Sequence, residues 1–174
     1  MLPNKNFFAK KTINDPKAAL SLSLSVISLV LFAVLTRWLP HPANVTGLLA
    51  VSIFSGAGLS RVFLKQKPFW QTILSVVTPL LALLISDLVL GSHETLAYVY
   101  SSIILISLFS QILSQSSVWQ KNSSTKSVFK WLRLPSLAVA SSLFFFVVTN
   151  FGVWFEMSIY PKTASGLLMC YVAA

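Results

Sequence analysis

The stretch Thr78–Glu94, TPLLALLISDLVLGSHE, decides how the chain is read. Most of it is apolar enough to lie in lipid, and Asp87 is the only acidic residue inside the apolar part. A charged side chain at the centre of a bilayer costs about 2.5–3.5 kcal/mol on insertion scales, and less near an interface. The stretch therefore predicts a membrane helix, and it predicts a partner for Asp87 elsewhere in the chain.

The rest of the chain has the same composition. Of its 174 residues 55% are hydrophobic and 10% are charged, whereas a soluble domain is about 25% charged. A spanning helix needs about 20 mostly apolar residues. The sequence therefore predicts an all-α integral membrane bundle, a single transmembrane domain over residues 1–174. Its six expected transmembrane helices cover about 18–36, 45–64, 70–91, 95–115, 135–155 and 163–174.

The sixth run is shorter than the others. Residues 163–174 reach about 18 Å as a helix, against a hydrocarbon core of about 30 Å. The run is either a half-span or the visible part of a truncated helix, and we expect truncation.

The basic residues indicate the orientation. Lysine and arginine gather on the cytoplasmic side of membrane proteins. With a cytoplasmic N-terminus, only Arg37 and Lys162 of the 13 basic residues lie outside. We therefore expect a multi-pass protein of the bacterial cytoplasmic (inner) membrane. The net charge of +9 does not indicate nucleic acid as a partner, because the basic residues fall between the apolar runs.

This orientation places the unusual polar side chains on the outer face, which becomes the expected substrate-binding site. Asp87 lies about one turn from the outer end of its helix, where Arg37 or Lys162 could meet it. The pair either locks two helices together or contacts a ligand, since intramembrane charges often mark functional paths. The candidate site residues are Arg37, His41, Asn44, Asp87, His93, Asn150, Trp154, Tyr160 and Lys162.

Asn150 and Trp154 lie one turn apart and share a helix face. An asparagine in an apolar run commonly forms a hydrogen bond to a neighbouring helix. A tryptophan near a helix end is typical of the membrane interface. Both side chains could also contact a ligand, and the sequence leaves these alternatives open.

Two features concern helix packing. Ser52, Gly56 and Ser60 recur every four residues and form a small face along which a neighbouring helix can approach closely. Pro79 is expected to kink its helix, which is tolerated where a neighbour satisfies the freed carbonyl.

The sequence contains no recognisable catalytic set and predicts no cofactor. His41, His93, Asp87 and Glu94 could converge on a metal ion, but no two of them have the i, i+4 spacing of helical ligands, so no metal site is expected. Cys170 is the only cysteine and lies in an apolar run, where a packing role is expected.

Three blocks of sequence carry a resemblance: RWLPHPANVTGLLAVSIFSGA (37–57), PLLALLISDLVLG (79–91) and VTNFGVWFEMSIYPKTASGLLMCYVA (148–173). They resemble an uncharacterised family of small bacterial six-helix membrane proteins. That family is distantly similar to the substrate-binding components of energy-coupling-factor vitamin transporters. The resemblance implies a six-helix bundle that takes a small nutrient from the outer face.

Two departures from the transporter pattern matter. The first helix has Ser21, Ser25 and Ser28 where substrate-binding components carry alanine-type spacing, which leaves partnership with energising transporter subunits open. Cys170 lies in the last run, whereas solitary cobalamin-importing relatives carry a ligand cysteine near the outer face. Cobalamin binding by that route is therefore not expected.

The expected function is that of a membrane substrate-binding and transport protein for uptake of a small, vitamin-like molecule. Its expected partners are the lipid bilayer and the small-molecule ligand. The alternative is a structural or assembly subunit of a membrane complex. A membrane enzyme that uses Asp87 and His93 is less favoured, because no nucleophile–base pair accompanies them.

Overall fold

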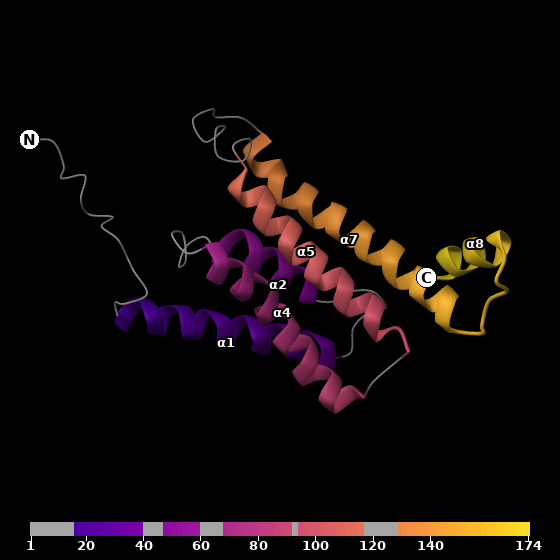
Figure 1. Cartoon of the computed structure of the whole chain (residues 1–174), viewed down its shortest axis with the longest axis horizontal. Coiled ribbons are helices and arrows are strands. Elements are labelled where there is room, and N and C mark those ends of the chain that lie inside the picture. Colours follow the sequence, from indigo (N-terminus) through magenta and orange to yellow (C-terminus); the bar gives the residue numbers. More distant parts are fainter. Residues whose placement is uncertain (1–15, 40–46, 60–67, 92–93, 117–128) are drawn as a thin grey trace, which may run out of the picture.

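The computed structural model describes residues 16–39, 47–59, 68–91, 94–116 and 129–174, and these residues form helices only (Figure 1). Helix α2 continues without a break into the π-helix η1, so the described residues hold six helices. Their bounds are α1 Pro16–Trp38, α2 Leu48–Phe54 with η1 Ser55–Leu59, α4 Pro68–Leu90, α5 Leu96–Gln115, α7 Phe129–Glu156 and α8 Ala164–Ala173.

Four of the six helices, α1, α4, α5 and α7, are long and apolar enough to cross a membrane. The other two are shorter within the described residues, where α2 with η1 covers Leu48–Leu59 and α8 covers Ala164–Ala173. The all-α prediction is confirmed, and of the six predicted transmembrane helices, the sixth of them short, these four are long and apolar enough to span a membrane.

Most predicted boundaries lie within two residues of the observed ones; α2 begins three residues later than expected, and the largest difference is at the start of α7. It begins at Phe129 and carries Pro135 inside it, whereas a start at Pro135 was expected. The expectation was wrong because it followed the apolar run. Polar residues outside the hydrocarbon can extend a helix, and a proline near its N-terminal end leaves only one early carbonyl without its usual donor.

Successive helices run in alternating directions, so the same ends gather together. The C-terminal end of α1 meets that of α4 through Arg37 and Asp87, and the first turns of α5 reach both α4 and α7 through Tyr100 and Tyr98. We call this the Arg37 end of the bundle and the opposite one the Lys17 end.

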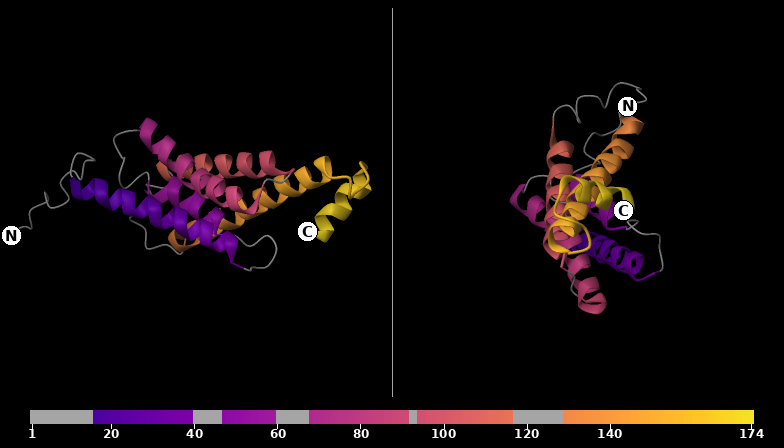
Figure 2. Two further views of the ribbon diagram at one scale, coloured as in Figure 1. Left: turned by 90° about the horizontal axis from the view of Figure 1, so that it is seen from below. Right: turned by 90° about the vertical axis from the view of Figure 1, so that its right-hand side faces the viewer.

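The apolar core lies between the two ends. It joins α1, α2, α4 and α5, which Figure 2 shows packed side by side. On α4 and α5 these residues lie between polar side chains nearer each end. We call this group the apolar layer; its buried members are Ala33, Val34, Leu48, Val51, Ala82, Leu83 and Ile103.

Helix η1 approaches α5 more closely than a side chain would allow. A Cβ atom added to Gly56 would lie 2.4 Å from the carbonyl oxygen of Ser107. Ser52, one turn earlier, is fully buried. The predicted close packing along this small face is confirmed for these two residues, while Ser60 lies outside the described residues.

Pro79 lies inside α4 and is buried. Because proline has no N–H, the carbonyl of Ser75 four residues earlier loses its helical donor. The hydroxyl of Ser55, on η1, donates to that carbonyl at 2.9 Å. The expectation that a neighbouring helix satisfies the freed carbonyl is therefore confirmed.

Helix α8 folds back onto the end of α7, at the far right of Figure 1. The Tyr171 hydroxyl donates to the carbonyl of Val147 at 2.8 Å, and the thiol of Cys170 reaches the carbonyl of Asn150 at 3.4 Å. Cys170 is buried, as expected of a packing residue.

Candidate functional site

Three side chains from three helices meet at the Arg37 end and form the charged cluster, defined as Arg37, Asp87 and Tyr100. Arg37 Nη2 of α1 lies 2.8 Å from Asp87 Oδ1 of α4. The hydroxyl of Tyr100, on α5, donates to Asp87 Oδ2 at 2.9 Å. The carboxylate of Asp87 therefore connects α1, α4 and α5.

The local backbone places Asp87 where the other two can reach it. Helix α4 ends at Leu90, and Gly91 follows with φ of 89°, a conformation that a residue with a Cβ rarely adopts. The Gly91 N–H donates to the carbonyl of Asp87 at 2.9 Å, which closes the last turn. Helix α5 runs antiparallel to α4, so that Tyr100 in its second turn lies level with Asp87.

The charged cluster is half-buried, and its hydrogen bonds are incomplete. The side chains of Arg37 and Asp87 are 17% and 9% exposed. Arg37 Nη1 and the Oγ of the neighbouring Ser86 have no hydrogen-bond partner in the described structure, and the contact of Asp87 Oδ1 is an ion pair outside hydrogen-bond geometry. An unsatisfied buried polar group costs about 1–3 kcal/mol. The cluster thus keeps unused hydrogen-bonding capacity.

The Arg37–Asp87 pair was one of two predicted alternatives, and the structure selects it over Lys162. Tyr100 was not predicted. Its contact with Asp87 could have been predicted from the spacing along the chain. Asp87 lies four residues before Gly91, and Tyr100 lies four residues after Leu96, the first residue of the next helix. In a helical hairpin, residues equally far from the turn lie at about the same depth.

A second group, the neutral cluster, lies nearer the Lys17 end and consists of Ser55, Thr72, Ser75 and Gln111. Gln111 Nε2 donates to Thr72 Oγ1 at 3.1 Å, and Gln111 Oε1 accepts from Ser75 Oγ at 3.0 Å. Ser55 closes the group by donating to the carbonyl of Ser75. These bonds connect η1, α4 and α5 without a charge.

Three other candidates gather at the turn between α7 and α8. Lys162 Nζ donates to the carbonyls of Trp154, Phe155 and Met157, with Phe155 at 2.7 Å and Met157 at 2.9 Å. These carbonyls lie at the C-terminal end of α7, where a cation is favourable. Lys162 therefore stabilises the end of α7, and Asp87 is not its partner.

Trp154 and Asn150 also make contacts at the α7–α8 turn. Trp154 Nε1 donates to the carbonyl of Pro161 at 2.9 Å, and Lys162 Nζ lies 5.6 Å from the centre of its ring. Asn150 Nδ2 donates within its own helix, to the carbonyl of Phe146 at 2.9 Å. Among the described residues, the expected bond from the Asn150 side chain to a neighbouring helix is not found, and only the backbone carbonyl of Asn150 reaches α8, through Cys170.

The structure thus divides the candidates into two groups. Arg37 and Asp87 meet in the charged cluster, while Asn150, Trp154 and Lys162 meet at the α7–α8 turn. Tyr160 is half-buried in that turn. His41, Asn44 and His93 lie outside the described residues. Within the described ranges, no three His, Cys, Asp or Glu side chains are grouped as metal ligands.

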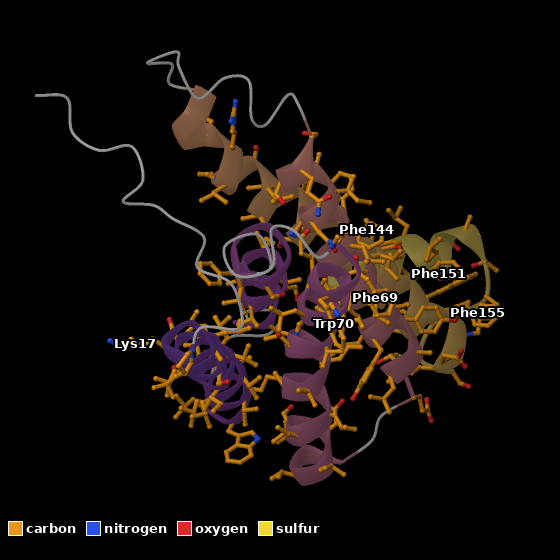
Figure 3. The ribbon with its side chains drawn as sticks, turned by 60° about the vertical axis from the view of Figure 1, so that its left-hand side comes forward. Lys17, Phe69, Trp70, Phe144, Phe151 and Phe155 are labelled. Carbon is orange, nitrogen blue, oxygen red and sulfur yellow. The ribbon has the colours of Figure 1, made fainter. Side chains whose placement is uncertain are left out.

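The first turns of α5 connect the two groups. Tyr98 faces α7, where its hydroxyl donates to Glu156 Oε1 at 3.2 Å and its ring packs edge-on to Phe151 at 6.4 Å. Tyr100, two residues later, faces Asp87. Figure 3 shows Phe144, Phe151 and Phe155 together on the α7 side of the bundle. The first turns of α5 therefore contact both Asp87 of the charged cluster and the last two turns of α7.

Comparison with known proteins returned one match. No curated protein and no solved structure matches the chain. A family model described as a family of unknown function, DUF6580, matches residues 18–174, which include every described helix except the first two residues of α1. The chain therefore belongs to the DUF6580 family, whose function is unknown.

Proposed function

We propose that the protein binds a small polar molecule at the Arg37 end of the bundle and takes part in its uptake across the membrane. The observation that carries the proposal is the unused hydrogen-bonding capacity of Arg37 Nη1 in the Arg37–Asp87 pair; the Oγ of Ser86, one residue before Asp87, also lacks a partner. Ionisable residues in membrane helices are costly and usually mark a functional path. A ligand that fills the unused positions would offset part of that cost.

The chemistry of the cluster favours a ligand with a carboxylate or a similar acceptor. A guanidinium group presents a planar fork of donors that fits carboxylate oxygens in pairs. Such a ligand would compete with Asp87 for Arg37. Release of Asp87 would loosen α1 from α4 at this end, while Tyr100 continues to hold the carboxylate toward α5.

Passage inward would require the apolar layer to open. Two neighbouring segments depart from a regular α-helix, namely α4 at Pro79 and η1 at Ser55–Leu59. Interruptions of this kind often occur at functional positions of membrane helices. They support a bundle that rearranges.

The distribution of charge supports the direction of uptake. With the Lys17 end in the cytoplasm, the charged cluster faces the outside of a bacterial inner membrane, which is the orientation the basic residues favour. The similarity to substrate-binding components of vitamin transporters belongs to the same proposal, and so does any energising subunit. It rests on analogy between families.

The proposal can be tested by native mass spectrometry of the full-length protein purified in a mild detergent. We expect a co-purifying small molecule that is lost in Arg37→Gln and in Asp87→Asn. Tyr98→Phe is the matched control, because it removes a hydroxyl–carboxylate bond at the same end of the bundle, to the exposed Glu156 of α7. A molecule retained equally by all three variants, or no bound molecule in the wild type, would count against the proposal.

The alternative is a structural or assembly subunit. It is favoured by the way Arg37 and Asp87 neutralise each other while tying three helices together. In that case the purified protein would carry tightly bound partner subunits and no small molecule. For a membrane enzyme, His93 would have to act with Asp87, and His93 lies outside the described residues, so no geometry supports that function.

A further inference from the structure

The charged cluster leaves one donor and one acceptor unused, and the two lie next to each other. Arg37 Nη1 has no hydrogen-bond partner in the described structure. Neither has Asp87 Oδ1, because its 2.8 Å contact with Arg37 Nη2 lies outside hydrogen-bond geometry. Both atoms are buried. Nη1 and Nη2 belong to one planar guanidinium group, so the unused donor adjoins the nitrogen that contacts Oδ1.

An acceptor alone would not complete this arrangement. When an acceptor of the ligand competes with Asp87 for Arg37, Oδ1 loses its contact with Nη2 and stays buried without a donor. The Tyr100 hydroxyl does not replace that contact, because it donates to the other oxygen, Oδ2, at 2.9 Å. A buried carboxylate oxygen without a partner is costly. A ligand that brings a donor beside its acceptor satisfies both Arg37 and Asp87.

The charges of the helices around the cluster lead to the same requirement. In α1, α2, η1, α4 and α5 the charged side chains are Arg37, Asp87 and Lys17. Arg37 and Asp87 neutralise each other, and Lys17 lies at the opposite end of α1. The site between these helices is therefore neutral before a ligand enters it.

The charged residues described elsewhere at the Arg37 end supply no buried counter-charge. Glu94 and Glu156 are exposed, and Glu156 accepts from the Tyr98 hydroxyl. Lys162 is exposed as well and donates to carbonyls at the end of α7. A net charge on the ligand would thus be buried without compensation from the described residues, which is strongly unfavourable.

We propose that the site takes a molecule without net charge whose acceptor and donor lie next to each other, with the acceptor on Arg37 and the donor on Asp87 Oδ1. An amino-acid-type zwitterion and a carboxamide share this chemistry. The inference rests on the function proposed above and narrows its ligand, because a carboxylate now needs an ammonium group beside it. With Tyr100 still on Oδ2, such a ligand joins α1 to α4 in place of the direct ion pair.

Four small probes test the requirement: alanine, propionamide, propionate and ethylammonium. Alanine differs from propionate by one ammonium group and from ethylammonium by one carboxylate. Binding is measured as the probe concentration that raises the thermal unfolding temperature of the full-length protein by a fixed amount, in detergent at constant ionic strength. We expect propionate and ethylammonium to need concentrations at least about ten-fold higher than the better of the two neutral probes. The order of alanine and propionamide distinguishes a zwitterion from an amide.

Asp87→Asn tests whether charge sets this preference. It leaves the Arg37 charge uncompensated, so propionate should now act at a concentration about ten-fold lower than alanine does. Tyr98→Phe is the control and should keep the wild-type order, because its hydroxyl contacts Glu156 outside the cluster. If Asp87→Asn does not fold, the double variant Arg37→Gln, Asp87→Asn replaces it. There the probe that stabilises the wild type should need about ten-fold more, since charge-assisted hydrogen bonds are lost.

Failure of this inference can be told apart from failure of the proposed function. If native mass spectrometry finds no co-purified molecule, the proposed function fails and this inference fails with it. If the co-purified molecule carries a net charge at neutral pH, only this inference is overturned. The same holds if propionate stabilises the wild type as well as the neutral probes do, if neither neutral probe stabilises it, or if Asp87→Asn keeps the wild-type order.

Discussion

The charged cluster and the neutral cluster both connect three helical segments through polar side chains, but they differ in how completely those side chains are hydrogen-bonded. Each joins side chains of three helical segments in the interior of the bundle, and α4 and α5 contribute to both. In the neutral cluster, hydroxyl and amide groups satisfy one another, and none of its members is left without a partner. In the charged cluster, Arg37 Nη1 and the adjacent Ser86 Oγ remain unpaired in the described structure.

This difference in hydrogen bonding indicates that the neutral cluster serves helix packing and that the charged cluster is the candidate binding site. A neutral network that is fully satisfied holds helices together at little cost, because no charge has to leave water. A buried ion pair carries a large desolvation cost, so its contribution to stability is a weak reason for its presence. The apolar layer keeps the two clusters apart, and each can therefore be altered while the other stays intact.

The largest expected effect comes from breaking the ion pair on one side. Asp87→Asn should lower the free energy of unfolding by about 3–5 kcal/mol, because it leaves the Arg37 charge buried without a counter-charge. Unfolding in mixed micelles, followed by circular dichroism, measures the change. The double variant Arg37→Gln, Asp87→Asn should recover most of the loss. A double variant as unstable as Asp87→Asn would show that the charges do not act as a pair.

The second effect concerns the close approach beside the neutral cluster. Gly56→Ala should cost about 1–3 kcal/mol, as overpacking of a tight interface does, because its Cβ would lie 2.4 Å from the Ser107 carbonyl oxygen. Gly58→Ala on the same segment is the control, since its Cβ would lie 3.4 Å from the ring of Phe54, an ordinary contact. The same unfolding measurement applies, and equal losses in the two variants would contradict the assigned contact.

The third prediction concerns the hydrogen bond from Ser55 to the Ser75 carbonyl, which lacks its helical donor because of Pro79. Ser55→Ala should cost about 1–2 kcal/mol, because the Ser75 carbonyl is then buried without a donor. Pro79→Ala restores an N–H to α4, so in its presence Ser55→Ala should cost much less. A double-mutant cycle measured by unfolding gives the coupling. Additive losses would mean that the hydroxyl does not substitute for the missing N–H.

The smallest expected loss of stability comes from removing the hydroxyl of either Tyr98 or Tyr100 on α5. Tyr100→Phe removes the bond to Asp87 and should cost about 0.6 kcal/mol, the average for hydrogen bonds between membrane helices. Tyr98→Phe should cost less, because its partner Glu156 is exposed. Thermal unfolding of the two variants side by side makes the comparison. A larger loss for Tyr98→Phe would place the more important contact of α5 on α7.

Several features could be read from local sequence alone. The apolar runs predicted the helices, because burial in lipid depends on composition over about 20 residues. The isolated charge of Asp87 predicted a partner, and Arg37 was one of two residues that alternation of the helices could bring to its depth. Pro79 and Gly56 predicted a supplied donor and a close approach, since the missing N–H and the missing Cβ are properties of those residues themselves.

Other features depended on how far each helix rotates and how closely it packs. Composition could not show that Lys162 would meet the carbonyls at the end of α7, because that contact follows from the path of a short turn. It could not show that Ser55, among many serines, faces Ser75. The division of the expected outer site into two groups has the same origin, because it depends on the packing of α5, which presents Tyr100 to Asp87 and Tyr98 to α7.

The sequence by itself determined the helical architecture, the need to compensate Asp87 and the places where a proline or a glycine would require a neighbour. Each of these follows from the solvation or the covalent structure of a single residue or run. Only the tertiary structure decided which side chains supply the compensation, because that depends on contacts between helices far apart in the chain. Tyr100 reaches Asp87, and Arg37 keeps an unused nitrogen, because of the relative placement of α1, α4 and α5.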